Sequence, residues 1–414
     1  MQHRVHHILL VASLYDSFNL FEDAQLSEML LTEFLELNIF HAPTITRVST
    51  ANKALKLLRS DSQYDLVITS LSVGRMNVVN FARRLKKARS DLPVILLSHD
   101  TKQLNDLRED PKGAVFDKIF LWQGDFHVLV GIIKYVEDRL NVEHDTLQMG
   151  VQIILLIEDN LKFYSSYLPM IYAEVMKHSH NLITEGVNQA HKILRMRARP
   201  KILWCETFEE AWNYFEHYEK FVLGVITDVE FPQNGIKDQG AGAKFARRVK
   251  ATRSDIPVVL QSFNKDNAAI ANDLSVGFIQ KDSPDLLKRL RNFMREHLGF
   301  GDFTFCLPDR RKSKRAEDYL SPERREIDSA TNLRMLENKI ASIPNESLVY
   351  HCERNHFSTW LKARTEFDLA AKLRPRRVAD YDSTEDVRKD IINHLQTARR
   401  TKQKADNKLQ STVI

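Results

Sequence analysis

The sequence predicts an α/β protein with two doubly wound domains, each built on a five-stranded parallel sheet, followed by a helical region. Short apolar runs alternate with helix-like stretches, this alternation occurs twice along the 414 residues, and it ends near residue 303. Runs of this length that are rich in β-branched and aliphatic residues are typical of buried strands in parallel sheets. The repeat is as long as a domain, which favours a duplicated domain over a solenoid.

The strands are predicted where the apolar runs lie. Four of the five strands of each domain can be assigned in this way, at residues 6–11, 65–70, 93–98 and 117–122 in the first and at 152–157, 222–227, 257–261 and 276–280 in the second. We predict three parts of the chain, with boundaries at 1–145, 150–303 and 304–414.

Five polar residues follow the strands of the second predicted domain. They are Glu158, Asp159, Asp228, Ser262 and Lys281. Because the carboxyl ends of parallel strands share one edge of the sheet, these side chains should meet in one crevice. An alternative is a doubly wound domain that merely carries acidic loops.

The chemistry of these five residues indicates a site for a cation and a phosphoryl group. Three carboxylates within about 4–6 Å repel one another by a few kcal/mol per pair, so a divalent cation is expected. Oxygen ligands suit Mg²⁺. An aspartate can accept a phosphoryl group, whose oxygens a hydroxyl and an ammonium group would bind.

Residues 150 to about 300 resemble the receiver (response regulator) family, which has a flavodoxin-like fold. The matching positions are the acidic pair Glu158 and Asp159, the phosphoacceptor Asp228, the switch hydroxyl Ser262, the lysine Lys281 and the switch aromatic Phe278. The resemblance implies that the backbone carbonyl of Glu230 completes the Mg²⁺ site. It also implies that a sensor histidine kinase or phosphotransfer protein supplies the phosphoryl group.

The first domain repeats the strands without this chemistry. Ala12 and Ser13 stand at the position of the acidic pair, Ser70 at the phosphoacceptor, Ser98 at the hydroxyl and Trp122 at the lysine. Asp16 comes late in its loop, and Asp65 lies at the wrong end of its strand. We interpret residues 1–145 as a pseudo-receiver with a binding or dimerising role.

Two segments of the second domain are longer than the pattern requires. Residues 159–198 predict one extended helix or a broken pair, which is either extra core or an interaction surface. Residues 230–250 are glycine-rich and predict a mobile flap beside Asp228.

The last part of the chain is predicted to be a charged linker followed by helices. Residues 307–330 are largely polar, and three helix-like blocks follow, the third opening with a capping box from Ser383 to Asp386. His351 and His356 stand five apart, which puts them on different faces of one helix and argues against a zinc site.

A narrower resemblance covers nearly the whole chain. Segments such as FYSSYLPMIYAEV and SLVYHCERNHFSTWLKARTEFDLAAKLRPRRV resemble the regulatory half of bacterial proteins in which tandem receivers precede a PEP synthase-like, PEP/pyruvate-binding catalytic half. The sequence ends before the ATP-grasp domain of that family would begin. The resemblance therefore implies enzymatic activity only for a longer chain, and for this one a phosphoacceptor role.

The amino-acid composition limits which other classes of protein the chain could belong to. With 43% hydrophobic and 28% charged residues, and with no apolar run that reaches the ~18 residues of a membrane span, we expect a cytoplasmic protein. Three dispersed cysteines argue against a disulfide framework. A stand-alone signalling adaptor and a homodimer through receiver or extended-helix surfaces remain open. Basic clusters and a net charge of +5 suggest nucleic acid, but interleaved acidic residues argue against it.

Overall fold

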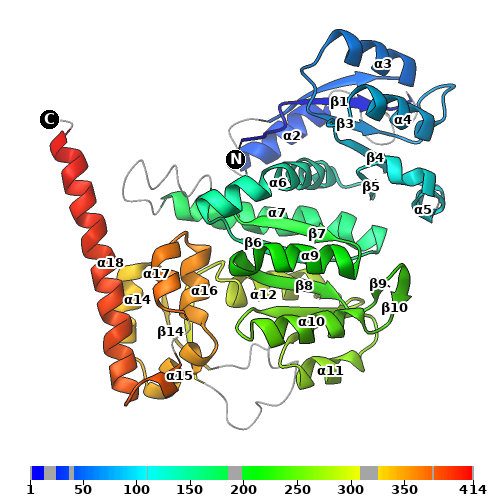
Figure 1. Ribbon diagram of the computed structural model, residues 1–414. Helices are drawn as coiled ribbons and strands as arrows, with labels where there is room; N and C mark the ends of the chain where they lie inside the picture. Colours follow the sequence, from blue (N-terminus) through cyan, green and yellow to red (C-terminus); the bar gives the residue numbers. More distant parts are fainter. Residues whose placement is uncertain are drawn as a thin grey trace. The chain divides into compact units, whose positions relative to one another are not determined.

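The structure is a computed structural model that describes residues 2–13, 25–36, 42–109, 111–184, 198–307, 325–374 and 377–412 (Figure 1). The chain forms two compact units, Met1–Glu143 with Asn160–Met176, and His144–Asp159 with Lys177–Ile414. The three parts predicted from the sequence, residues 1–145, 150–303 and 304–414, remain predictions. The two compact units divide the chain in a different way.

The first unit contains a five-stranded parallel sheet with the strand order β2-β1-β3-β4-β5. Every strand predicted for this domain is present. The strands are β1 (His7–Val11), β2 (Thr44–Val48), β3 (Leu66–Thr69), β4 (Val94–Ser98) and β5 (Lys118–Leu121). The helices between and after them are α2 (Gln25–Glu36), α3 (Ala51–Ser60), α4 (Val78–Ala88), α5 (Thr101–Glu109) and α6 (His127–Met149), with the short η1 (Pro111–Val115) before β5. The order is that of flavodoxin-like folds.

The predicted extended helix is α7 (Leu161–Thr184), and residues 185–197 of that prediction lie outside the described part of the chain. Its first part belongs to the first unit. There the Tyr164 hydroxyl donates to the Ile119 carbonyl at 2.6 Å, and the Ser165 hydroxyl accepts from the Leu121 amide at 3.0 Å. Both acceptor and donor lie on the edge strand β5, so α7 covers an edge that would otherwise be open to pairing. The apolar side chains of this first part of α7, among them Tyr164, Leu168 and Ile171, are fully buried and so belong to a core.

The second unit repeats the architecture with the strand order β12-β11-β8-β6-β7. Its predicted strands are also all present. They are β6 (Ile153–Ile157), β7 (Lys201–Cys205), β8 (Val222–Asp228), β11 (Val258–Ser262) and β12 (Gly277–Gln280). The helices around this sheet are α9 (Phe208–Tyr218), α10 (Ala241–Thr252), α11 (Asn267–Asp273) and α12 (Leu286–His297), with η2 (Glu219–Phe221) before β8. Each residue of β6 is fully buried, as expected for a central strand.

The predicted flap after Asp228 contains a β-hairpin. Residues of β9 (Phe231–Gln233) pair antiparallel with β10 (Ile236–Asp238). The connecting residues Asn234 and Gly235 have φ angles of 53° and 76°. Positive φ at both central residues is typical of a tight type I′ turn, for which Asn-Gly is strongly preferred.

The strand pattern does not end at residue 303, which corrects the sequence prediction. The strands β13 (Phe303–Leu307) and β14 (Arg325–Ala330) pair antiparallel across the predicted linker, of which residues 308–324 lie outside the described part. The helices that follow are α14 (Leu333–Ile340), α15 (Asn345–Glu353), α16 (His356–Ala363), α17 (Phe367–Lys372) and α18 (Thr384–Thr412), with η3 (Val378–Asp380) before the last. They share one hydrophobic core with β13 and β14.

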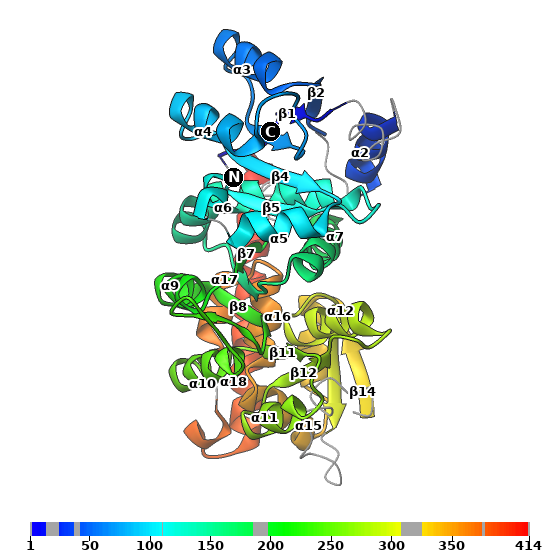
Figure 2. The same cartoon turned by 90° about the vertical axis from the view of Figure 1, so that its right-hand side faces the viewer.

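Breaks between α15, α16 and α17 were not predicted. Asn355 adopts φ 54° and Thr365 φ 63°, so the chain turns sharply at both positions. The turn at Asn355 brings the Nδ1 atoms of His351 and His356 to 2.9 Å, which contradicts their predicted placement on different faces of one helix. Figures 1 and 2 show α18 running along the shorter helices of this region. Ser383 caps it as predicted, since its hydroxyl accepts from the Asp386 amide at 3.2 Å.

Within the residues that the structure describes, no helix is long and apolar enough to cross a membrane. The three cysteines are buried and unbridged, as the sequence predicted.

A buried ion pair joins the end of α6 to β7 in the second unit. The Lys201 ammonium lies 2.8 Å from Asp145 Oδ2, and both side chains are at most 1% exposed. Burial opposes ionisation of Asp145, but the positive charge of Lys201 outweighs it and lowers the pKa of this carboxyl to about 2. The folded state therefore favours the charged form.

We expect Asp145→Asn to lower the free energy of unfolding of the second unit by about 3–5 kcal/mol, because the buried Lys201 ammonium would then face a neutral amide. Denaturant unfolding followed by tryptophan fluorescence measures this. The double variant Asp145→Leu/Lys201→Met should recover most of the loss. In the wild type, the contribution of Asp145 is present above the unfolded pKa of 3.8 and is lost as the pH falls toward 2. Equal stability of wild type and Asp145→Asn at neutral pH would contradict this account.

Candidate functional site

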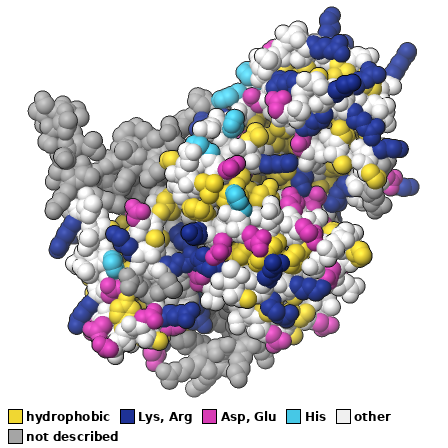
Figure 3. All heavy atoms as spheres, viewed as in Figure 1, with side chains coloured by type: hydrophobic (Ala, Val, Ile, Leu, Met, Phe, Trp, Pro, Cys, Tyr) yellow, Lys and Arg dark blue, Asp and Glu magenta, His cyan; other side chains and the backbone are white. Residues whose placement is uncertain are grey.

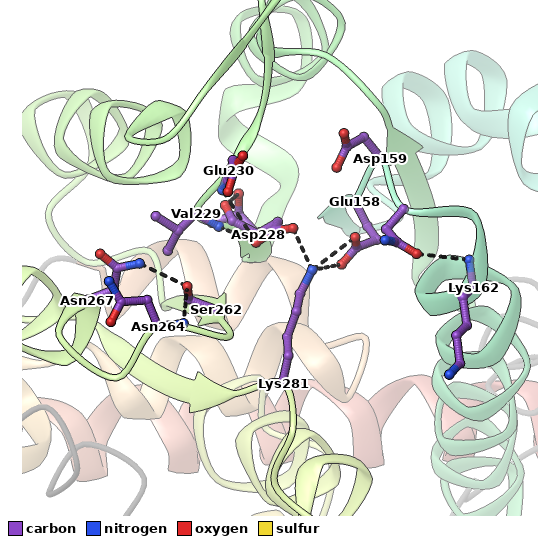
Figure 4. Close-up of polar contacts among 12 residues, drawn as sticks. Glu158, Asp159, Lys162, Asp228, Val229, Glu230, Ser262, Asn264, Asn267 and Lys281 are labelled. Atoms are coloured by element: carbon purple, nitrogen blue, oxygen red, sulfur yellow. Dashed lines mark hydrogen bonds and ion pairs between the residues drawn. The ribbon is translucent and has the colours of Figure 1, made fainter. Parts of the chain in front are cut away.

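The carboxyl ends of four strands of the second sheet meet at one site, as the sequence predicted. Glu158 and Asp159 follow β6, Asp228 ends β8, Ser262 ends β11 and Lys281 follows β12. The parallel register places Asp228 opposite Gln261 and Ser262 opposite Gln280. All five residues belong to the second unit, and Figure 4 shows them around a common centre.

Lys281 is the central cation of this site. Its ammonium lies 2.5 Å from Asp228 Oδ2 and 2.7 Å from Glu158 Oε2. The Lys281 and Glu158 side chains are at most 1% exposed. Burial works to lower the pKa of Lys281, but the charges of Glu158 and Asp228 outweigh it and raise that pKa. Lys281 is thus held fully charged between two carboxylates (Figure 4).

The second oxygen of Asp228 is bound by the backbone that follows it. The amide of Val229 donates to Asp228 Oδ1 at 2.7 Å, and the amide of Glu230 does so at 3.4 Å. Together with Lys281, these donors fix the Asp228 carboxylate from both sides. One carboxylate oxygen is therefore oriented by backbone and the other by an ammonium group.

Asp159 completes an acidic cluster on the far side of Glu158 and Asp228 from Lys281 (Figure 4). Burial, followed by the nearby charge of Asp228, raises the pKa of Asp159, although Lys237 and Lys281 act in the opposite direction. Oxygens of Glu158, Asp159 and Asp228 lie within 4.8 Å of one another. Among the residues that the structure describes, this is the only such group of potential ligands found. Three hard oxygen donors at this spacing fit a magnesium-sized cation.

Ser262 lies on the other side of Asp228 and is held by local contacts. Its hydroxyl oxygen accepts from the Asn264 amide at 3.1 Å and from the side-chain amide of Asn267 at 2.8 Å. Phe278, on β12, is only 4% exposed. The Ser262 hydroxyl is therefore positioned by hydrogen bonds, and the Phe278 ring is held by burial within the unit.

Gly242 shapes the site, although the sequence indicates only that it lies in the glycine-rich segment 230–250. A Cβ atom at this position would lie 2.0 Å from the carbonyl oxygen of Asp228. The Gly242 amide donates to the Val229 carbonyl at 2.9 Å, which ties the start of α10 to the Asp228 loop. Only a residue without a side chain permits this approach.

Two further contributors were missed. The Trp204 indole donates to the Glu158 carbonyl at 2.9 Å and so supports the loop after β6. Nothing in its sequence neighbourhood indicates this. Lys237 reaches the acidic cluster from the hairpin, its ammonium 3.9 Å from Asp159 Oδ2. The Asn-Gly pair at 234–235 is a hairpin signal that could have placed it.

The corresponding strand ends of the first unit carry the predicted replacements. The Ser70 hydroxyl donates to the Ser72 carbonyl at 3.0 Å, and the Ser98 hydroxyl accepts from the Asp100 amide at 3.2 Å. Asp65 accepts from the His6 and His7 amides, so it ties the start of β1 at the opposite end of the sheet. Asp16 lies outside the described residues.

Comparison with known proteins gives structural neighbours only. No family model and no curated protein matches the chain. It is similar to the signal receiver domain of an HD domain-containing protein from Pseudomonas fluorescens Pf-5, with 21% identity over 36% of this chain and 97% of that one and a TM-score of 0.25. It is also similar to two response regulator/GGDEF domain proteins, at 13% and 14% identity, over 69% and 70% of this chain and 96% and 98% of theirs, both with a TM-score of 0.30. The assignment of the fold stands on the strand order of the two sheets.

We expect Gly242→Ala to destabilise the second unit by about 1–3 kcal/mol, because the new methyl group would displace the start of α10 from the Asp228 carbonyl. Helix propensity alone predicts the opposite sign. Denaturant unfolding of the variant measures the effect. Gly240→Ala is the matched control, since its Cβ would have Asp238 Oδ1 at 3.6 Å as its nearest contact. A stabilised Gly242→Ala variant would contradict the close approach.

Proposed function

We propose that the second unit is a working receiver of a two-component signalling system, phosphorylated on Asp228 in a Mg²⁺-dependent reaction. The observation that carries this proposal is the Lys281 ammonium between Asp228 and Glu158 at the carboxyl edge of the sheet, beside a cluster of three carboxylates. The strand order and the five residues in sequence support it.

The chain's own residues are suited to accept a phosphoryl group. A carboxylate oxygen of Asp228 attacks phosphorus and forms an O–P bond, while the bond from phosphorus to the donor atom breaks and its electron pair leaves with the donor. A phosphohistidine or a small acyl phosphate is a suitable donor. Lys281 stays beside the new phosphoryl oxygens, and the Val229 amide holds the other Asp228 oxygen in place.

Mg²⁺, held by Glu158, Asp159 and Asp228 with the backbone carbonyl of Glu230, would supply charge neutralisation for the incoming phosphoryl group. The three carboxylates fit this ion by donor type and by their mutual spacing.

The switch proposed to follow involves Ser262 and Phe278. The Ser262 hydroxyl, which accepts from Asn267 in this structure, would turn to donate to a phosphoryl oxygen. Phe278 would then fill the space that Ser262 leaves. This is a local electrostatic change that biases an element with two states.

We propose that the first unit is a pseudo-receiver, because an alanine, two serines and a tryptophan occupy the positions at which a receiver has its acidic residues and lysine. Its role would be to bind a partner or a second copy of the chain. The sequence resemblance to the regulatory half of PEP synthase-like proteins supports a PEP synthase-like catalytic half as the regulated target. The alternative is that the chain is a signalling adaptor in the cytoplasm, with a separate kinase and a separate target. An adaptor would use the same phosphorylation site.

Nucleic-acid binding receives no comparable support. On the face shown in Figure 3, acidic and basic side chains are interspersed over the lower part of the view, whereas lysine and arginine predominate toward its upper right. A nucleic-acid interface requires such a basic surface, but charge alone is equally typical of a solvated face, and no nucleic-acid-binding motif accompanies it in the sequence.

Incubation with Mg²⁺ and acetyl phosphate should add one phosphoryl group to the wild type and none to Asp228→Asn. Intact mass measures the addition, and lability to base distinguishes an acyl phosphate from a phosphoserine. Asp266→Asn, on an exposed residue, is the control for a neighbouring charge change. Phosphorylation that persists in Asp228→Asn, or that is absent from the wild type with and without Mg²⁺, would overturn the proposal.

Ser70→Asp should not make the first unit a phosphoacceptor, because Ala12, Ser13 and Trp122 still replace the acidic pair and the lysine. The variant is best tested in the Asp228→Asn background, where the same mass measurement has no contribution from the second unit. Mg²⁺-dependent labelling of Ser70→Asp would show that the first unit retains a working site.

A further inference from the structure

A second lysine approaches the acidic cluster from the hairpin that follows Asp228. The Lys237 ammonium lies 3.9 Å from Asp159 Oδ2 and 3.8 Å from Glu230 Oε1. Its side chain is 56% exposed, in contrast to the buried Lys281. Lys237 thus reaches the cluster from solvent, beside Asp159 and Glu230. Figure 4 shows these two carboxylates on the side of the cluster away from Lys281.

The hairpin that carries Lys237 is anchored at several points. Phe231, in β9, is fully buried and stacks on Phe208 of α9 with a centroid distance of 6.5 Å. At the turn, the Asn234 amide donates to Glu209 Oε1 at 2.8 Å. After β10, Asp238 accepts from the Gly240 amide at 2.8 Å and pairs with Lys244. These contacts place Lys237 near Asp159 as a feature of the folded unit.

We propose that Lys237 is a built-in counter-cation that competes with the divalent cation for the acidic cluster, so that the hairpin sets the metal affinity of the site. This inference rests on the proposed function, since it concerns the same cluster. It names a residue that tunes the affinity and leaves the identity of the phosphoacceptor unchanged.

The charges of the site explain the competition. Glu158, Asp159, Asp228 and Glu230 contribute four negative charges, and Lys281 and Lys237 contribute two positive ones, which leaves −2. A divalent cation neutralises this remainder. The cation would nevertheless lie close to the Lys237 ammonium, and like charges at such distances repel by about 1 kcal/mol or more even in water. Lys281 is buried between two carboxylates, whereas the exposed side chain of Lys237 can turn away.

Isothermal titration of the full chain with MgCl₂ at low ionic strength tests the proposal. We expect Lys237→Met to lower the dissociation constant for Mg²⁺ by about three- to tenfold, because the repulsion is removed. Lys237→Arg keeps the charge and should remain within about twofold of the wild type. Added salt should reduce the difference between wild type and Lys237→Met, since it screens the exposed lysine.

Lys220→Met is the matched control. Lys220 is also exposed, but it lies in η2 before β8, at the edge of the sheet opposite the carboxylate cluster. Its removal makes the same change in net charge and should leave Mg²⁺ affinity within about twofold of the wild type. Asp159→Asn removes a proposed ligand and should weaken Mg²⁺ binding. This result would show that the heat measured in the titration comes from binding at this site. Thermal unfolding checks that each variant is folded, and Lys237→Gln serves as a second neutral variant.

The outcomes separate the two proposals. Unchanged or weaker Mg²⁺ binding by Lys237→Met, or the same gain in Lys220→Met, would overturn the role of Lys237 while leaving the metal site in place. Absence of Mg²⁺ binding by the wild type and by all variants would overturn the metal site itself and this inference with it.

Discussion

The second unit depends on the burial of the Lys281 ammonium between the carboxylates of Glu158 and Asp228. Bringing an isolated ammonium or carboxylate out of water costs several kcal/mol, and only close pairing offsets this cost. The three groups come from β6, β8 and β12, so the pairing is made only when these strands take the observed order and register. A slip of one residue in any of them would turn the charged group to the opposite face of the sheet. The ion cluster therefore selects one arrangement of strands, and the same arrangement creates the site.

The hairpin after Asp228 lengthens the chain between β8 and α10 without disturbing the carboxylate. The chain leaves the sheet at Val229 and comes back beside it in the first turn of α10, where the Gly242 amide donates to the Val229 carbonyl. This hydrogen bond closes the insertion at its base. The absence of a side chain at Gly242 allows the contact, because a Cβ atom would overlap the Asp228 carbonyl. The insertion can therefore carry new side chains, such as Lys237, to the rim of the site while the backbone at its centre is unchanged.

The sequence was sufficient for the parts of the fold that follow from local pattern. Buried strands in a parallel sheet are short apolar runs, so their positions and the convergence of Glu158, Asp228 and Lys281 could be predicted. The parts that were missed depend on contacts between distant residues. The pairing of β13 with β14 joins two segments separated by a charged stretch, and half-exposed strands such as β14 lack a strong apolar signal. His351 and His356 come together because Asn355 turns the chain, and a left-handed asparagine is not marked in a helical pattern.

The C-terminal helices contact the second sheet domain at points away from the site. Asp255, which precedes β11, accepts from the Asn355 side chain at 2.9 Å and pairs with Arg374. Ser262 ends the same strand at the carboxyl edge. A strand held in a sheet by hydrogen bonds on both sides moves as one element, so a displacement of β11 would alter the contacts of Asp255. A change confined to the side chains of the site would leave the contacts of Asp255 with Asn355 and Arg374 intact. Coupling between two regions requires an element that moves, and not contiguity alone. The contacts of Asp255 therefore distinguish a displacement of β11 from a change limited to the side chains of the site.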